Sequence, residues 1–404
     1  MFVGGEFMKL VKDCDLFAFL GCCPLIAAGL QTLCLSLVVL TIDTAQGQQA
    51  VANNNQLQDI VPSLDSVTVF GAVGDGIADD TVAIQAALDR NQKVHLPRPQ
   101  VVFRVRSLRV RAGQSLIGPG KVIPCLKGDG TGPTVVMGDL SDPTLSSRNV
   151  LISGLNISNE DYPAVGIYNS PNFTIRDSQF SSKNTNTLEI RKSWRGVVEL
   201  NNIYQSGGGW AVSAMYDVNS LTIRDNVITG GRAGNGIDLG RSQNVRIQNN
   251  TMEVNGGYGI RVSGNSDTTL SGVCNAVSIT GNYLEQTVIP IALGEIFAVH
   301  SAVVSGNYVG NNLSPKTITQ QRVGFLVLGR VSAASIFSNS YLGGKIEPFV
   351  VFRFISSAGV EEFLNTSRIE SNFFSNTVSS FLLQGFTSPE RQTQLFVRNH
   401  IDLS

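Results

Sequence analysis

The chain has 404 residues, of which 30 are Lys or Arg and 31 are Asp or Glu, so its formal charge at pH 7 is −1. Only 15% of the residues are charged, and the positive and negative charges nearly cancel. The chain therefore has no overall electrostatic field that would attract nucleic acid or an anionic membrane. Glycine is abundant (41 residues) and helix-favouring runs are scarce after residue 90, a composition that is typical of strands joined by turns.

The N-terminal segment differs from the rest of the chain. Residues 16–42 carry no charge and follow two lysines, which is typical of an export signal or a membrane anchor. The run exceeds the signal-peptide core of about 7 to 15 residues and reaches the roughly 20 needed to span a bilayer. Small residues at Ala45 and Gly47 favour cleavage there, so we expect a secreted or cell-envelope protein, with membrane anchoring through residues 16–42 as the alternative. The expected organisation is a signal peptide or membrane anchor over residues 1–47, a linker over 48–65 and one folded domain over 66–404.

Residues 71–89, GAVGDGIADDTVAIQAALD, resemble a ligand loop at first sight. The glycines run G-x-x-G-x-G, and neither a βαβ unit nor a Lys-Ser/Thr pair follows, which excludes the dinucleotide and phosphate-loop motifs. An EF-hand loop starting at Asp75 complies at only two positions and lacks its closing Glu. We therefore expect no cofactor, with Ca2+ at this loop as the alternative.

The same stretch predicts a helix over about residues 79–90. Asp79 or Asp80 would cap its first turn, and Ile84, Ala87 and Leu88 would form its apolar face. Alternating strands punctuated by Gly and Pro follow, so the helix precedes an all-β region.

A repeat begins near residue 152. A β-branched residue followed five positions later by an apolar one recurs nine times, at spacings of 23 to 33 residues. The return limbs are Gly-rich and alternating rather than helical and leucine-dominated, which favours a parallel β-helix over a leucine-rich repeat. Asn tolerates left-handed backbone at turns, and stacked Asn amides can bond from coil to coil. Seven of the nine repeats place Asn three positions after the β-branched residue: Asn201, Asn226, Asn250, Asn282, Asn307, Asn339 and Asn372.

The N-terminal motif and the repeats together resemble a known superfamily. FGAVGDGIADDTVAIQAALD, followed by VHLP and SLIGPG, is similar to the first segment of the pectate-lyase-like superfamily. The resemblance implies an all-β, right-handed parallel β-helix solenoid with a short N-terminal capping α-helix. Its members include polysaccharide lyases, rhamnogalacturonase-type hydrolases, epimerases and phage tailspikes, so the fold alone does not fix the reaction. The paired aspartates and Gly-His-Gly turn of the hydrolase branch do not occur here, and a tailspike would need no export segment.

Counting back from the repeat positions predicts which side chains form outward columns. The column nine residues back contains Gly166, Glu189, Ala214 and Asp238, and it continues to Arg261 in the next coil. The column seven residues back contains Tyr168, Arg191, Tyr216 and Gly240. The column six residues back contains Asn169, Lys192, Asp217 and Arg241. Adjacent coils lie about 4.8 Å apart. Glu189 and Asp238, two coils apart, would then be separated by about 9 to 10 Å, near the upper end for an inverting glycosidase.

These columns support two interpretations. One is an ion-pair ladder on a solvated sheet, in which Lys192, Asp217 and Arg241 alternate in sign. The other is a polysaccharide groove. In that groove the candidate catalytic residues are Glu189, Arg191, Tyr216, Asp238 and Arg261, and the candidate substrate-binding residues are Tyr168, Lys192, Trp210 and Arg241.

The favoured function is an exported, lyase-like enzyme acting on uronate-containing polysaccharide. Arg191 or Arg261 would neutralise the uronate carboxylate, and Tyr216 or Lys192 would handle the proton beside it. The alternatives are an inverting hydrolase that uses Glu189 and Asp238, and a non-catalytic surface or adhesive protein.

Three further expectations concern the second half of the chain. Long repeat spacings predict loops near residues 264–275, 310–322 and 356–365 that would wall a cleft. Phenylalanines clustered after residue 348 are expected inside the last coils. No C-terminal cap is evident, so the last coil would be covered by an upstream segment or would pair with another copy in a homo-oligomer.

Overall fold

The computed structural model describes residues 66–231, 233–253, 256–262, 273–296, 298–310, 323–342, 350–355, 367–375, 379–384 and 397–402. Contacts group residues 64–404 into one compact unit. The expected signal or anchor segment, the linker and most of the three expected loops lie outside the described residues. Among the described residues, no helix is long and apolar enough to cross a membrane.

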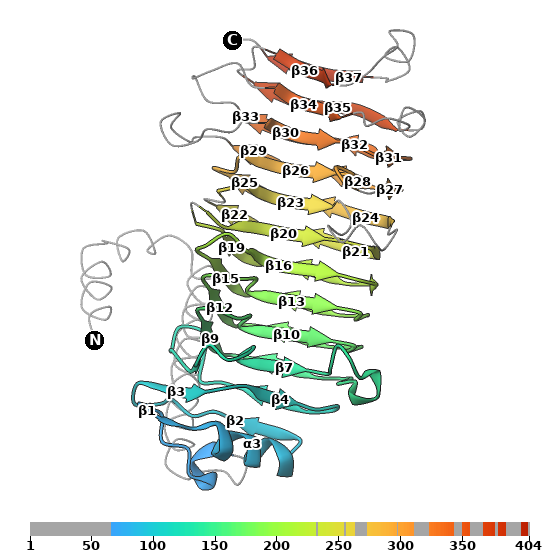
Figure 1. The fold of residues 1–404 in the computed structure, drawn as a ribbon. Helices are drawn as coiled ribbons and strands as arrows, with labels where there is room; N and C mark the ends of the chain where they lie inside the picture. Colours follow the sequence, from blue (N-terminus) through green and yellow to red (C-terminus); the bar gives the residue numbers. More distant parts are fainter. Residues whose placement is uncertain are drawn as a thin grey trace, which may run out of the picture. The chain divides into compact units, whose positions relative to one another are not determined.

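The unit is built from coils of three short strands, and all strand pairings in its described part are parallel (Figure 1). The strands form one sheet of 26 strands and another of 11, counted over the described residues. The larger sheet has two flanks, here called the first and second flank according to the order of their strands in each coil. The smaller sheet, which follows the second flank in each coil, is called the third sheet.

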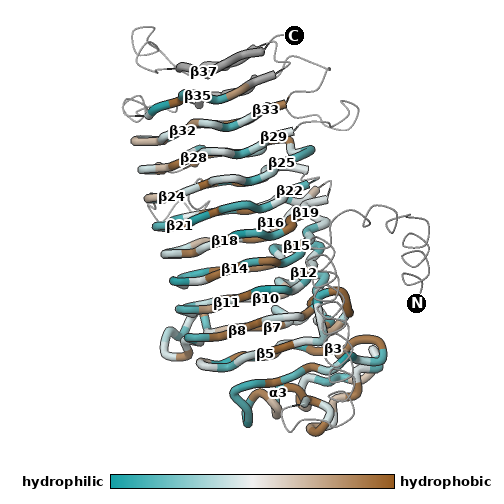
Figure 2. Tube along the Cα trace, turned by 180° about the vertical axis from the view of Figure 1, so that it is seen from behind, coloured by the Kyte–Doolittle hydropathy of each residue, from teal (hydrophilic) through white to brown (hydrophobic). Residues whose placement is uncertain are grey.

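The first flank carries the β-branched repeat positions. Its strands are β2 (Lys93–His95), β5 (Ser115–Ile117), β8 (Leu151–Ser153), β11 (Thr174–Arg176), β14 (Val197–Glu199), β18 (Thr222–Arg224), β21 (Ser242–Gln248), β24 (Cys274–Thr280), β28 (Val303–Ser305), β32 (Ser335–Phe337), β35 (Arg368–Ser375) and β37 (Val397–Asp402). Three short strands precede it in some coils: β17 (Val218–Asn219), β27 (Val299–His300) and β31 (Val331–Ser332). Figure 2 shows this flank stacked strand over strand, with the hydropathy of the residues alternating along the tube.

The second flank and the third sheet complete each coil. The second flank contains β1 (Asp75–Asp79), β3 (Val102–Val105), β6 (Leu126–Gly128), β9 (Asn156–Asn159), β12 (Gln179–Ser182), β15 (Asn202–Gln205), β19 (Val227–Thr229), β22 (Thr251–Glu253), β25 (Tyr283–Glu285), β29 (Tyr308–Gly310) and β33 (Ser340–Leu342). The third sheet contains β4 (Leu108–Val110), β7 (Val135–Met137), β10 (Val165–Tyr168), β13 (Leu188–Arg191), β16 (Trp210–Met215), β20 (Asn235–Leu239), β23 (Tyr258–Val262), β26 (Ile289–Leu293), β30 (Val323–Leu328), β34 (Val350–Ile355) and β36 (Ser379–Gln384).

The core follows from the alternation of side chains along each strand. Every second residue points inward and stacks on its equivalent in the next coil, as Ile175, Val198 and Ile223 do with no exposed surface. These residues and their counterparts in the other strands form one continuous hydrophobic cluster. The predicted all-β solenoid is therefore confirmed.

The predicted asparagine ladder is present at the turn between the two flanks. Each Asn Nδ2 donates to the Oδ1 of the next Asn along the series, over 2.8–3.0 Å, from Asn201 to Asn372. The backbone N–H of each donor residue reaches the same oxygen, and all seven side chains are buried. The ladder satisfies polar groups that would otherwise be buried without partners at every coil.

The predicted helix is α3 (Thr81–Arg90), which lies at the start of the stack and buries Ile84, Ala87 and Leu88 completely (Figure 1). The prediction for its cap was partly wrong. Asp80 occupies the N-cap position, but its carboxylate accepts the N–H groups of Val73 (2.7 Å) and Gly74 (3.2 Å) instead of those of the helix. Asp79 accepts the Thr81 N–H over 3.0 Å. Two 3-10 turns, η2 (Val67–Phe70) and η3 (Pro143–Leu145), complete the secondary structure of the described residues.

Two other expectations need correction. The predicted helix start at residue 79 was too early, because Asp75–Asp79 form strand β1, paired in parallel with β3, so the glycine-rich segment belongs to the solenoid itself. Gly74 and Gly76 have φ of 68° and 78°, and a Cβ on Gly74 would lie 2.8 Å from the Phe103 ring. Phe373 is 39% exposed rather than internal, whereas the other phenylalanine side chains after residue 348 lie outside the described side chains. Cys125 and Cys274 are both buried and form no disulfide.

Candidate functional site

The predicted outward column on the third sheet is present, but one of its positions holds a different residue from the one predicted. Strand register aligns Gly166, Glu189, Ser213, Asp238 and Arg261 on successive coils. The prediction of Ala214 at this column was wrong, because Ala214 pairs with Ile190 and points into the core.

The error has a local cause. The coil that contains β16 is two residues longer than the one before it, with one extra residue before the strand and one in the turn after it. Tyr216 and Asp217 both adopt left-handed backbone there, with φ of 61° and 66°. Met215, not Tyr216, is therefore aligned with Arg191, and Tyr216 belongs to the turn.

Tyr168, Glu189 and Arg191 form the first polar cluster on the third sheet. The Tyr168 hydroxyl donates to Glu189 Oε2 over 2.6 Å, and Arg191 Nη2 donates to Glu189 Oε1 over 2.5 Å. Burial, with the neighbouring Glu189 carboxylate, raises the pKa of Tyr168 far above its usual range, so its hydroxyl stays protonated. Gly166 is required beneath the ring, since a Cβ there would lie 2.7 Å from the Tyr168 hydroxyl oxygen. The Arg191 guanidinium also lies 5.3 Å from the centroid of the Tyr216 ring.

Asp238 and Arg261 form the second polar cluster. Arg261 Nε donates to Asp238 Oδ1 over 2.9 Å and Nη2 donates to Oδ2 over 2.6 Å, and the Asp238 side chain is only 1% exposed. The guanidinium also lies over Trp210, 4.5 Å from the ring centroid, and 5.3 Å from that of Tyr258. Burial raises the pKa of Asp238, and the hydrogen bonds and charge of Arg261 oppose that shift. Both carboxylate oxygens are thus held by one arginine, which leaves Asp238 badly placed to exchange a proton with a substrate.

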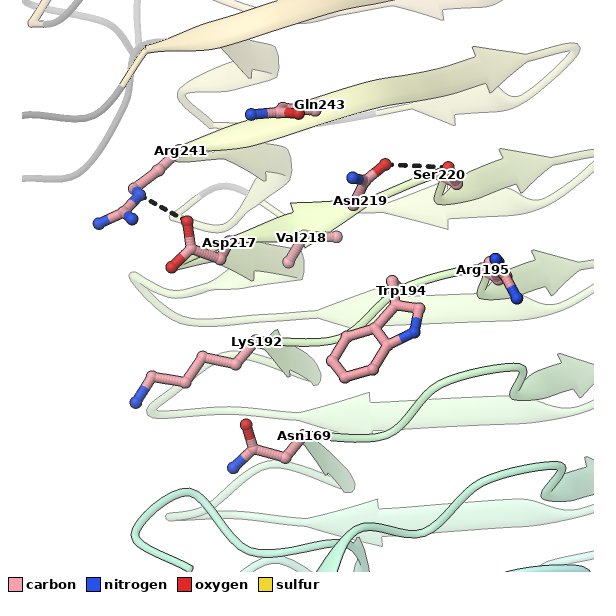
Figure 3. Close-up of a pocket in the computed structure, with 10 residues that line it drawn as sticks. All are labelled: Asn169, Lys192, Trp194, Arg195, Asp217, Val218, Asn219, Ser220, Arg241 and Gln243. Atoms are coloured by element: carbon pink, nitrogen blue, oxygen red, sulfur yellow. Dashed lines mark hydrogen bonds and ion pairs between the residues drawn. The ribbon is translucent and has the colours of Figure 1, made fainter. Parts of the chain in front are cut away.

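A groove of about 490 Å3 lies past the carboxyl ends of the third-sheet strands, and we call it the cationic groove (Figure 3). It crosses four coils, with Asn169 on the first, Lys192 on the second, Asp217 on the third and Arg241 on the fourth. Arg241 Nε pairs with Asp217 Oδ1 at 2.5 Å, as the predicted alternation of charge suggested. Lys192 and a further cation of the groove, Arg195, have no carboxylate partner within 4.0 Å among the described residues.

Sequence reasoning missed six residues of this groove, among them Trp194 and Arg195. The Trp194 side chain lies in the middle of the groove in Figure 3, is 42% exposed and is held by a backbone bridge to Asn219 of the next coil. A tryptophan two positions after Lys192, where the other coils carry small or polar residues, was the signal available in the sequence. Trp210 packs against Arg261, and its stacking on sugar stays a prediction.

The groove is lined by strained backbone. Asn169 and Lys192 occupy equivalent turn positions with φ of 47° and 48°, and the next coil places Tyr216 and Asp217 there. Asn tolerates this conformation, but Lys and Tyr rarely adopt it. Strained residues of this kind occur often at binding and catalytic sites.

No group of three or more His, Cys, Asp or Glu side chains within the described residues could hold a metal ion. Asp75 Oδ1 accepts the N–H groups of Ile77 and Ala78, each over 2.8 Å, and these bonds lower the pKa of Asp75. The Ca2+ alternative at this loop stays a prediction.

Comparisons with known proteins agree on the fold. The family model described as "Right handed beta helix region" matches residues 144–275. The part of this chain that the structure describes is a right-handed parallel β-helix. A search of curated protein sequences found no match.

Solved structures resemble this β-helix at low sequence identity. The A-module of the mannuronan C-5 epimerase AlgE6 of Azotobacter vinelandii is 17% identical, with a TM-score of 0.58 over 84% of this chain and 98% of that one. The surface protein and adhesin PfbA of Streptococcus pneumoniae is 16% identical, with a TM-score of 0.54 over 83% and 96%. The tailspike of the E. coli bacteriophage HK620, solved with a pentasaccharide, is 13% identical, with a TM-score of 0.62 over 82% and 66%. Identities this low establish the shared fold alone.

Proposed function

We propose that the protein is a secreted or surface-held enzyme that binds an anionic, uronate-containing polysaccharide in the cationic groove and acts on it by lyase-like chemistry. The observation that carries the proposal is the composition of the groove: three cations, Lys192, Arg195 and Arg241, face one acid, Asp217. Two of these cations have no carboxylate partner in the described part of the chain, and an exposed tryptophan lies beside them. Cations can bind uronate carboxylates, and an aromatic ring can pack on the apolar face of a sugar.

The groove suits chemistry at the carbon beside a carboxylate. In β-elimination a base removes the C5 proton, the electron pair forms the C4–C5 double bond, and the C4–O bond breaks as its oxygen takes a proton. In epimerisation the proton returns to C5 from the opposite face. Both reactions accumulate negative charge on the uronate carboxylate, which nearby cations stabilise.

We assign a role at the substrate to the cations that have no carboxylate partner among the described residues. Arg191 and Arg261 each hold a buried or half-buried carboxylate, so we assign them to positioning within the third sheet rather than to the substrate. Arg195 would bind the uronate carboxylate and Lys192 would handle the C5 proton. Tyr216, whose ring lies under Arg191, borders the same turn and remains the second candidate for the proton.

The fold neighbours are compatible with this proposal. One is named as an epimerase of mannuronan, and another was solved with a pentasaccharide. Both resemble this chain in fold. The adhesin neighbour represents the non-catalytic alternative, in which the groove binds a surface glycan and performs no reaction.

The proposal is tested by incubating the purified full-length protein with polyuronates and with neutral polysaccharides. A lyase produces unsaturated ends that absorb ultraviolet light, an epimerase changes the uronate composition seen by proton NMR, and a hydrolase produces reducing ends without absorbance. Either of the first two outcomes with a polyuronate supports the proposal. Binding without product supports the adhesin-like alternative. If the protein neither binds nor converts any of these polysaccharides, both the enzymatic and the adhesin-like function are refuted.

A further inference from the structure

A second groove lies at the opposite ends of the third-sheet strands, beside the second flank. It consists of two adjoining hollows, of about 510 and 290 Å3, that share Lys127 and Glu160. Its floor is formed by β6, β9, β12 and β15, which run into the turns that precede the third sheet. We call it the second-flank groove. None of its residues lines the cationic groove.

A single outward column runs along the floor of this groove. Strand register aligns Lys127 with Ser158, Ser158 with Ser181 and Ser181 with Tyr204. Three steps between coils of about 4.8 Å give the column a length of about 14 Å. This length suits several linked sugar units rather than one small molecule.

The side chains of the column are available to a ligand. The hydroxyls of Ser158 and Ser181 have no hydrogen-bond partner among the described residues, and the Tyr204 side chain is 45% exposed. Lys127, Lys183 and Glu160 border the column without forming an ion pair within 4.0 Å in the described part of the chain. A row of free hydroxyls that ends on an exposed aromatic ring matches the hydroxyls and the apolar face of a sugar.

The charge of the groove points to the class of sugar. Its charged residues are Arg104, Lys127, Lys183, Asp129, Glu160 and Asp161, three of each sign. The cationic groove, by contrast, has two more positive than negative residues. A groove with no net charge gives no electrostatic advantage to a polyuronate.

We propose that the second-flank groove binds a neutral oligosaccharide, as a site separate from the cationic groove. Tyr204 stacks on a sugar ring, and Ser158 and Ser181 hydrogen-bond to its hydroxyls. This site would hold a neutral stretch or branch of a glycan while the cationic groove engages an acidic one, and it does not depend on the reaction proposed for that groove.

The test is calorimetric titration of the full-length protein with neutral hexasaccharides of glucose, mannose, galactose and xylose, and with a hexauronate. We expect at least one neutral hexasaccharide to bind, and Tyr204→Ala to weaken it by about tenfold, as for an aromatic residue central to a binding site. Ser181→Trp, which fills the middle of the column from a surface position, should abolish that binding.

Two controls separate this site from misfolding and from the cationic groove. Tyr283→Ala removes another exposed tyrosine of the second flank, outside the groove, and should leave binding unchanged. Trp194→Ala should also leave the neutral hexasaccharide unaffected. The proposal is overturned if no neutral hexasaccharide binds, if Tyr204→Ala binds like the wild type, or if the hexauronate competes for the Tyr204 site.

Discussion

The outward face of the third sheet and the cationic groove carry the same kinds of residue in different states. On the third sheet, Arg261 and Arg191 each hold a carboxylate, and Asp238 is almost completely buried. In the groove one ion pair is largely exposed, and Lys192 and Arg195 are uncommitted among the described residues. Charged side chains in a coil-to-coil column therefore indicate a ligand-binding site only where the protein supplies no oppositely charged partner for them.

This difference explains why the sequence supported two interpretations at once. The ion-pair ladder describes the Asp217–Arg241 pair correctly, and the same kind of pairing holds Asp238 and Arg261, which had been assigned to the groove. The polysaccharide groove stays a prediction, and it draws on Lys192, which has no such partner in the described residues. Both interpretations drew on the same columns, and burial, which the sequence does not show, separates them.

The largest expected effect tests whether Asp238 serves the fold. Asp238→Ala would leave Arg261 half-buried without its carboxylate, so we expect a loss of about 3 to 5 kcal/mol in the free energy of unfolding. Asp217→Ala breaks an exposed pair and should cost about 0 to 1 kcal/mol. Urea denaturation of the two variants beside the wild type measures both. Equal losses would mean that the two regions do not differ in the way described.

A second prediction places the chemistry in the groove. Lys192→Met keeps most of the side-chain volume and removes the charge and the proton-transfer group, so kcat should fall by about a hundredfold, within the usual range for a general acid or base. Lys121→Met removes a half-buried lysine outside the groove, whose Nζ donates to the Leu200 carbonyl oxygen, and should leave kcat unchanged. Two measurements distinguish proton transfer by Lys192 from substrate binding by Lys192. Loss of a proton-transfer group changes the shape of the pH profile of kcat, whereas loss of a binding contact raises KM. If Glu189→Gln abolished activity and Lys192→Met did not, the catalytic groups would lie on the third sheet.

Much of the fold was predictable, and the site was less so. The repeat of β-branched residues and Asn fixed the coil, because both must recur wherever a strand stacks on a strand and a turn on a turn. The helix face of Ile84, Ala87 and Leu88 was equally clear. Asp80 was not, because its carboxylate binds N–H groups that approach it from the preceding glycine turn, a contact that helix rules do not describe.

At the site, the limit was register. Counting back along the sequence worked for Glu189 and Asp238 but failed for Ala214, since a turn can absorb one residue in left-handed backbone without disturbing the strands beside it. Counting back was also correct for Asn169, Lys192, Asp217 and Arg241, which line the groove together. Trp194 lies in a coil of regular length, and no periodicity marks it.

A smaller effect concerns affinity. Asp217 is the one acid among the described charged residues of the cationic groove, and it pairs with Arg241. Asp217→Asn keeps the size of the side chain and releases Arg241, so we expect a polyuronate to bind about threefold to tenfold more tightly at low salt, and the gain to shrink as added salt screens the charges. Titration at two salt concentrations measures it. Asp177→Asn, an exposed aspartate on another turn, is the matched control. An unchanged affinity would show that the ligand does not reach this part of the groove.

The smallest expected effect extends the comparison to pH. Asp139, beside the third sheet, accepts hydrogen bonds from the Ser141 side chain and from backbone N–H groups, and these, with Arg109, lower its pKa to about 2. Because the folded state holds this carboxyl ionised, its contribution to stability is present above its unfolded pKa of about 4 and is lost as the pH falls towards about 2. Asp238 has a raised pKa, so its contribution changes in the opposite direction and does not add to the acid-induced loss. Thermal midpoints of Asp139→Asn and the wild type should therefore differ less at pH 2 than at pH 5. A constant difference across that range would assign the low pKa of Asp139 no part in acid unfolding.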